Sequence, residues 1–158
     1  MIEDAETGDC ITTEVLPVVA GDIRTLGPGW KFDWRAEVKR VEVFKLIQLA
    51  APEAILGLMA LRRHPNYVEV TLLESHPQHV GKAKRFLGIA GSLLAFAAQL
   101  SFVNGGEGFI AIDAKNELIE HYQQVYGFER LGKSQRLILA TEAAARLIEK
   151  YVGRHPNA

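Results

Sequence analysis

The residues best suited to chemistry are basic side chains and glycines that precede one long apolar segment. Arg85, Gly88 and Gly91 open this segment, which continues as an alanine- and leucine-rich run to Val103. A glycine turn lets the backbone approach a ligand closely, and the helix behind it directs free N–H groups and the positive end of its dipole at that ligand. The pattern predicts an anion site that suits a phosphorylated cofactor.

The charge around this turn agrees with an anion site. No aspartate or glutamate occurs between Ser75 and Gly106, whereas Lys82, Lys84 and Arg85 directly precede the apolar segment. We expect these cations to pair with phosphate, and a solvated basic loop is the alternative interpretation.

The elements that must position this turn follow from apolar spacing and turn signals. Residues 41–50, 54–62 and 67–75 are β-rich stretches separated by short turns, which predicts an antiparallel meander. A helix over 88–103 and a strand over 107–113 then predict a right-handed parallel crossover. A helix over 116–126, strands over 128–131 and 135–140, and an amphipathic helix over 141–152 complete the expected order.

The first 40 residues carry weaker signals. Residues 1–10 are acidic and are expected to be loose, whereas 11–20 are rich in Ile, Thr and Val and contain Pro17, which predicts an edge strand. Trp30, Phe32 and Trp34 alternate with polar residues, which predicts a strand with all three rings on one face. These rings are expected to face the core, with an aromatic wall of a substrate pocket as the alternative.

Length and composition bound the class of protein. The chain has 158 residues, which suits one domain over 1–158. Its net charge of −1 and pI near 6.5 favour neither a nucleic-acid partner nor an anionic membrane. The lone Cys10 excludes an internal disulfide, and the five histidines form no recognisable metal motif, so no metal is expected. The acidic N-terminus lacks a secretion pattern, and no apolar run approaches the ~18 residues of a membrane span, so the expected compartment is the cytoplasm.

Two motifs in this order resemble the GCN5-related N-acetyltransferase (GNAT) superfamily. The first is Arg85-x-x-Gly88-x-Ala90 with the helix behind it, which is similar to the Arg/Gln-x-x-Gly-x-Gly/Ala signature that grips the coenzyme A pyrophosphate. The second runs from Asn116 through Tyr122 to Gly127-Phe128 and is similar to the family's late asparagine, helix tyrosine and closing Gly-Phe. The resemblance covers about residues 41–140.

The resemblance implies an α/β fold of the α+β kind. Its central sheet is mostly antiparallel, has one parallel strand-helix-strand crossover, is splayed at the cofactor cleft and is flanked by helices. Pantetheine is then expected between the strands that end at Ser75 and Asp113. The family's acceptor specificity lies mostly in variable segments, which here are residues 1–40.

The chain departs from the family pattern in two places. Gln78-x-x-Gly81-x-Ala83 matches the pyrophosphate signature once before Arg85 matches it again. The Arg85 register is preferred because a Leu-Leu helix follows it directly, and the loop is best treated as one cradle from Gly81 to Ser92. The second motif carries one extra residue between Tyr122 and Gly127.

The implied activity is transfer of an acetyl group from acetyl-coenzyme A, by direct attack, to a primary amine of a small molecule or a protein. The residues expected to bind the cofactor are Leu73, Ser75, Gly81, Lys82, Arg85, Gly88, Ile89, Ala90, Gly91, Ser92, Asn116 and Tyr122.

The catalytic roles implied by the resemblance fall on three residues. Tyr122 lies where the family's thiolate-protonating tyrosine falls, and a phenol with a pKa near 10 is protonated at neutral pH; Tyr126 is the fallback. Glu69 and Glu74 are both candidates for the general base. Because they lie five residues apart on one expected strand, they point to opposite faces, and only one of them faces the pocket.

Two other interpretations remain open from the sequence. The chain is alternatively a noncatalytic acyl-coenzyme A-binding or regulatory module that keeps the same fold. Independently of either activity, the aromatic N-terminal segment and the C-terminal helix are candidates for the interface of a homodimer.

Overall fold

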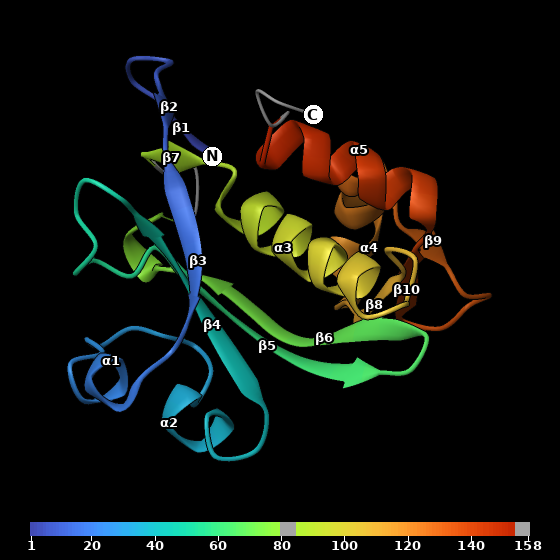
Figure 1. The fold of residues 1–158 in the computed structure, drawn as a ribbon, viewed down its shortest axis with the longest axis horizontal. Helices are drawn as coiled ribbons and strands as arrows, with labels where there is room; N and C mark the ends of the chain where they lie inside the picture. The colour runs from blue at the N-terminus through green and yellow to red at the C-terminus, as the bar shows by residue number, and fades with distance from the viewer. Residues whose placement is uncertain (80–84, 154–158) are drawn as a thin grey trace. The chain divides into compact units, whose positions relative to one another are not determined.

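The computed structural model describes residues 1–79 and 85–153, which divide into two compact units. The first unit comprises Met1–Leu61 and Leu72–Leu93, and the second comprises Arg62–Thr71 and Leu94–Ala158. Strands β5 (Gly57–His64) and β6 (Tyr67–Ser75) contribute residues to both units. The hydrogen-bonded strand order is β3-β4-β5-β6-β8-β10-β9 (Figure 1).

The first unit is built on antiparallel strands covered by two short helices. Strand β3 (Thr13–Pro17) pairs with β4 (Glu42–Gln48), and β4 pairs with β5. Strand β3 ends the series and has Pro17 as its last residue, so the predicted edge strand is confirmed. Helices α1 (Ala20–Arg24) and α2 (Trp34–Glu37) follow β3, and Trp34 is buried with core residues of β4 and β5.

The predicted strand over Trp30–Trp34 is wrong. Trp34 is instead the first residue of α2, because the carboxylate of Asp33 accepts the Ala36 N–H at 3.1 Å and caps that helix. Capping satisfies a backbone N–H that a helix start otherwise leaves without a partner. The prediction that these rings face the core agrees with the structure. Trp34 is 1% exposed, and both Trp30 and Phe32 pack against the hydrophobic core cluster that contains it.

The expectation of a loose N-terminus is also wrong. Strand β1 (Ile2–Asp4) lies between β2 (Cys10–Ile11) and β7 (Phe86–Leu87) in a second, three-stranded sheet (Figure 1). Ile2 is only 2% exposed, so burial of an apolar side chain fixes a segment whose acidic composition suggested disorder. A short 3-10 helix, η1 (Pro77–His79), follows β6.

The parallel pair predicted from the strand-helix-strand order is confirmed. Strand β6 pairs in parallel with β8 (Ile110–Asp113), from Val68 opposite Ile110 to Val70 opposite Ile112. Helix α3 (Ile89–Val103) precedes β8 in the chain. The result is a mixed sheet in an α/β fold, as the sequence predicts.

The rest of the second unit extends this sheet and adds helices. Strand β8 pairs antiparallel with β10 (Arg136–Leu139), which pairs in turn with β9 (Glu129–Arg130). Helix α4 (Asn116–His121) continues into a π-helical turn, η2 (Tyr122–Tyr126), and α5 (Thr141–Tyr151) ends the described chain (Figure 1). No helix within residues 1–79 and 85–153 has both the length and the apolar character needed to cross a membrane.

Candidate functional site

The start of α3 presents unpaired backbone donors behind a glycine. Gly88 has a φ of +97°, a left-handed conformation that favours glycine, and its carbonyl accepts the Ser92 N–H at 2.9 Å. The N–H groups of Ile89, Ala90 and Gly91 have no acceptor among the described residues. Because α3 is 15 residues long, its dipole places partial positive charge at these donors. This arrangement can bind an anion.

The N-terminal strand engages two side chains that the sequence assigns to the cofactor. The Ser92 hydroxyl donates to the Met1 carbonyl at 2.9 Å. Arg85 lies 3.7 Å from the Asp4 carboxylate, and its backbone carbonyl accepts the Ala5 N–H at 2.7 Å. The side chain of Arg85 is 63% exposed, so it remains accessible to solvent and to ligands. Sequence reasoning missed this contact because residues 1–10 were expected to be loose.

The other residues expected to bind the cofactor around this turn lie at the end of β6, at the start of α3 and in the stretch between them. Gly81 and Lys82 lie outside the described residues, and so does the rest of the competing signature after His79. Leu73 and Ser75 lie at the end of β6 with partly buried side chains. Ile89 is buried and packs closely on the first unit's sheet, where a Cβ built at Gly57 would lie 2.7 Å from its side chain. Glycine at position 57 therefore lets α3 approach this sheet.

Glu74 holds the segment between α1 and α2 in place. Its carboxylate accepts the backbone N–H of Lys31 at 2.6 Å, that of Phe32 at 3.2 Å, and the indole N–H of Trp34 at 2.8 Å. Hydrogen bonds to an ionised carboxylate are stronger than neutral ones. Both oxygens are engaged by donors, a geometry that suits positioning of the segment more than proton transfer.

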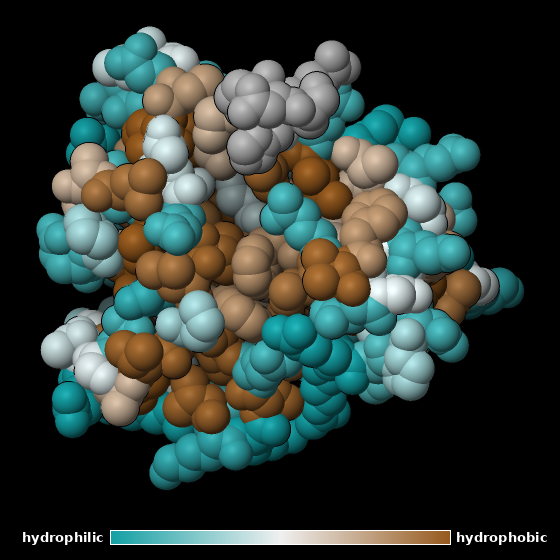
Figure 2. Space-filling view, viewed as in Figure 1, coloured by the Kyte–Doolittle hydropathy of each residue, from teal (hydrophilic) through white to brown (hydrophobic). Residues whose placement is uncertain are grey.

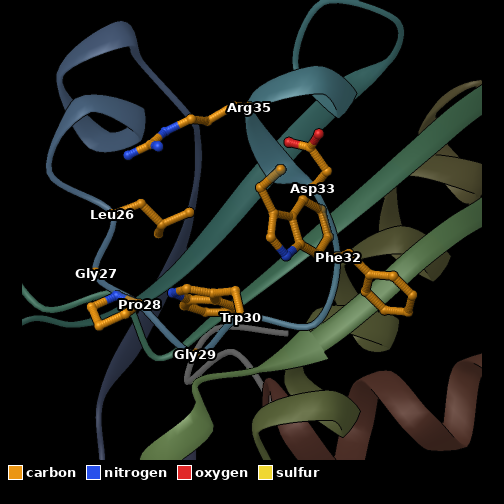
Figure 3. A pocket seen from close by; sticks show the side chains of 9 residues that line it. Leu26, Gly27, Pro28, Gly29, Trp30, Phe32, Asp33 and Arg35 are labelled. Carbon is orange, nitrogen blue, oxygen red and sulfur yellow. The ribbon is translucent and has the colours of Figure 1, made fainter.

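The segment fixed by Glu74 borders a pocket of about 360 Å³. Figure 3 shows the ring of Trp30, together with Leu26 and the Gly27-Pro28-Gly29 turn, around this space, whereas the ring of Phe32 extends away from them. The indole N–H of Trp30 is buried and has no acceptor among the described residues. The aromatic segment therefore packs against the core and also borders this pocket.

Glu69 lies in a charged cluster within the second unit. Its carboxylate is 3.0 Å from Nε2 of His64 and 3.1 Å from the guanidinium of Arg136, which also lies 3.3 Å from Asp113. The hydrogen bond with His64 is the main cause that holds the pKa of Glu69 below its ordinary value. Burial opposes the shift, and the hydrogen bond with Arg136 adds to it. His64, which stacks on Tyr67 at 4.4 Å, was not singled out from the sequence.

The depressed pKa of Glu69 predicts a contribution to stability with a defined pH dependence. A carboxyl whose pKa is lower when folded stabilises the fold above its unfolded pKa, and this contribution is lost as pH falls through the folded pKa. We expect Glu69→Gln to reduce the loss of stability that accompanies acidification below about pH 4.5, the ordinary glutamate value. Urea denaturation at pH 7 and pH 3 measures this difference, with Glu117→Gln in α4 as a control; equal acid sensitivity of the wild type and Glu69→Gln would contradict it.

Tyr122 begins the π-helical turn and packs in an aromatic cluster. Its ring centroid lies 5.7 Å from those of Tyr126 and Phe128. Burial raises the pKa of the Tyr122 phenol above its ordinary value of 10.0, so the hydroxyl stays protonated at neutral pH. That hydroxyl has no hydrogen-bond partner within the described ranges.

The π-turn accounts for the extra residue in the second motif. An α-helix that gains one residue turns all following side chains by about 100°, whereas a π-turn absorbs the insertion locally. Here the turn over Tyr122–Tyr126 ends at Gly127, whose φ of +87° is left-handed. Asn116, at the other end of this motif, accepts a hydrogen bond from the side chain of Gln135 at 3.2 Å.

Comparison with protein-family models gives no match, and comparison with curated protein sequences gives none either. Solved structures do match. AtaTR bound with AcCoA superposes with a TM-score of 0.58 at 15% identity, over 86% of this chain and 98% of that one. The KacTA–DNA complex superposes with a TM-score of 0.61 at 14% identity, over 88% of this chain and 99% of that one. AtaT complexed with acetyl-methionyl-tRNAfMet superposes with a TM-score of 0.56 at 16% identity, over 85% of this chain and 98% of that one.

These matches correct one expectation. The near-neutral charge of the chain predicts no nucleic-acid partner, but chains with this fold occur in complexes with DNA and with tRNA. Net charge averages over the whole surface, whereas nucleic acid contacts only part of it, so the inference from composition was wrong.

The topology and the comparisons agree on the fold. The antiparallel strands β3 to β5, the parallel pair β6–β8 reached through α3, and the final β10–β9 pair match the order that the two motifs imply. The structures of the AtaT toxin and of KacT superpose on most of this chain, so they share its fold. Among residues 1–79 and 85–153, no group of three potential metal ligands is present. The chain has the fold of the GCN5-related N-acetyltransferase superfamily.

Proposed function

We propose that the chain is an acetyl-coenzyme A-dependent N-acetyltransferase that transfers an acetyl group to a primary amine by direct attack. The observation that carries the proposal is the trio of N–H groups at the start of α3, directly behind Gly88, which have no acceptor among residues 1–79 and 85–153 of a chain with the GNAT fold. Similar structures have been solved with AcCoA bound, which supports the same cofactor here.

The residues present fit a coenzyme A pyrophosphate. Backbone donors at residues 89–91 and the dipole of α3 favour a dianionic group. Arg85, whose exposed guanidinium lies 3.7 Å from the Asp4 carboxylate, adds a cation three residues before Gly88. No described residue between Ser75 and Gly106 is an aspartate or a glutamate, so no carboxylate of that segment repels phosphate. When bound, acetyl-coenzyme A supplies the reactive thioester.

The reaction requires one proton to leave the amine and one to reach the sulfur. In the proposed sequence, the neutral amine nitrogen attacks the thioester carbon, the C–N bond forms, and the C–S bond breaks to release a thiolate. The nitrogen gives its surplus proton to solvent water. Tyr122 is the proposed proton donor to that thiolate, because its raised pKa keeps it protonated and its hydroxyl has no competing partner in the described chain.

The two candidate bases differ in their surroundings. Glu74 already accepts three N–H groups. Glu69 shares its carboxylate with His64 and Arg136, and its depressed pKa makes it a weak base. It therefore suits electrostatic binding of the acceptor as an ammonium group, which loses a proton to solvent before its neutral nitrogen attacks. Of the two, we propose Glu69 as the residue that contacts the acceptor amine.

Tyr122→Phe is expected to lower kcat for acetyl transfer by about 100-fold or more, because a positioned acid contributes at this scale. The affinity for acetyl-coenzyme A should stay within a factor of about 2, since the cofactor's phosphates bind elsewhere. The measurement is acceptor-dependent release of free thiol over a panel of amines. The panel includes aminoacyl-tRNA, because AtaT has been solved with acetyl-methionyl-tRNAfMet.

Tyr126→Phe is the matched control, because this ring belongs to the same cluster and its burial also raises the phenol pKa. Loss of turnover in Tyr126→Phe alone would assign the acid to that residue instead. Saturable cofactor binding without thiol release for any amine would favour the alternative, a noncatalytic acyl-coenzyme A-binding module.

A further inference from the structure

A groove in the first unit lies beside α1 and α2. It encloses about 660 Å³. Its floor is aliphatic and includes Val18, Ile23 and Val38, and none of its lining residues in the described part of the chain is aromatic. Figure 2 shows apolar side chains gathered over α1 and α2, at the lower left of the view, with hydrophilic side chains along the lower rim.

The rim of this groove carries three cations. Arg24 lies on α1, and Arg35 and Lys39 lie on and just after α2. All three side chains are exposed, and none has a carboxylate partner within the described residues. Figure 3 shows the side chain of Arg35 extending from α2 toward the α1 segment.

The nearby carboxylates are engaged elsewhere. One oxygen of Asp22 accepts Nζ of Lys45 at 2.7 Å, and the other accepts a backbone N–H at 2.9 Å. Asp33 caps α2, and Glu37 lies 3.9 Å from Arg40. Because these internal contacts use the acidic side chains of residues 18–40, the cations at the rim are left to interact with a partner.

We propose that this groove docks an acidic amphipathic segment of a partner protein, independently of acetyl transfer. Apolar side chains of the segment would cover Val18, Ile23 and Val38, while its carboxylates would face Arg24 and Lys39. An aliphatic floor favours such a segment over single-stranded nucleic acid, which binds through aromatic rings that stack on the bases.

The test uses the full chain and a fluorescein-labelled helical peptide with leucines on one face and glutamates on the other. Fluorescence anisotropy is expected to show saturable binding that weakens with added salt. The same peptide with glutamine in place of glutamate should bind at least about tenfold more weakly, since the rim charges lose their partners.

The variant Arg24→Ser/Arg35→Ser/Lys39→Ser should also weaken binding of the glutamate peptide about tenfold or more. The control Lys115→Ser/Lys133→Ser/Arg146→Ser removes as many exposed cations from the second unit and should leave binding unchanged. Absence of saturable binding, or equal loss in both variants, would overturn the proposal. Tighter binding of a single-stranded RNA oligonucleotide that is lost only in the groove variant would overturn it too and would make this a nucleic-acid surface.

Discussion

Glu74→Ala is expected to lower the free energy of unfolding by about 3 kcal/mol, because it leaves three donors without their acceptor. These donors are two backbone N–H groups and the indole N–H of Trp34, a side chain that is 1% exposed. A buried donor that loses its partner carries the desolvation cost of the folded state with no compensating hydrogen bond. We expect the segment between α1 and α2 to loosen first.

The measurement is urea denaturation followed by tryptophan fluorescence. The chain has two tryptophans, Trp30 and Trp34, and both lie in the segment that Glu74 fixes, so this signal reports on it directly. Glu53→Ala, which removes an exposed glutamate from the same unit, is the control and should change stability by less than about 0.5 kcal/mol.

The same variant separates two roles for Glu74. If it supports the segment, Glu74→Ala lowers stability and Glu74→Gln retains only part of it, because an amide has one acceptor oxygen in place of two. An unchanged unfolding curve combined with loss of acetyl transfer would instead assign Glu74 as the general base.

The order of elements was predictable because it rests on local patterns. Strand β6 has the bounds expected from its β-rich run, and α3 begins one residue later than predicted. The parallel crossover follows from that order and from chain handedness. Periodicity and turn signals report on neighbours in sequence, which is why they identify elements whose own residues bury one face.

The errors arose where contacts distant in sequence decide the structure. The Trp30–Trp34 segment alternates like a strand, but Glu74, about 40 residues away, binds its N–H groups and Asp33 starts a helix. Strand β1 is fixed by β7, which lies more than 80 residues later. No local pattern reports such partners, and the same limit hid the contact of Glu69 with Arg136, which lies 67 residues later.

Gly88→Glu is expected to abolish detectable binding of acetyl-coenzyme A, with a rise in Kd of at least about 100-fold. The new carboxylate would stand beside the free N–H groups of residues 89–91 and repel the pyrophosphate. The side chain also strains a backbone with a φ of +97°, at a cost of about 1–2 kcal/mol. Isothermal calorimetry measures the affinity, and the thermal shift with and without acetyl-coenzyme A checks it.

The strain must be separated from the loss of the anion site, and the other end of α3 offers a matched control. Gly105 also has a left-handed φ, of +84°, and a Cβ there meets nothing within 4 Å. Gly105→Glu therefore imposes the same kind of backbone strain and the same charge away from the N–H groups of residues 89–91. Wild-type affinity in Gly105→Glu, with none in Gly88→Glu, would support phosphate binding at the start of α3. Unchanged affinity in Gly88→Glu, with loss in Gly81→Glu, would move the pyrophosphate to the Gln78 register, because only there does position 81 supply the signature glycine.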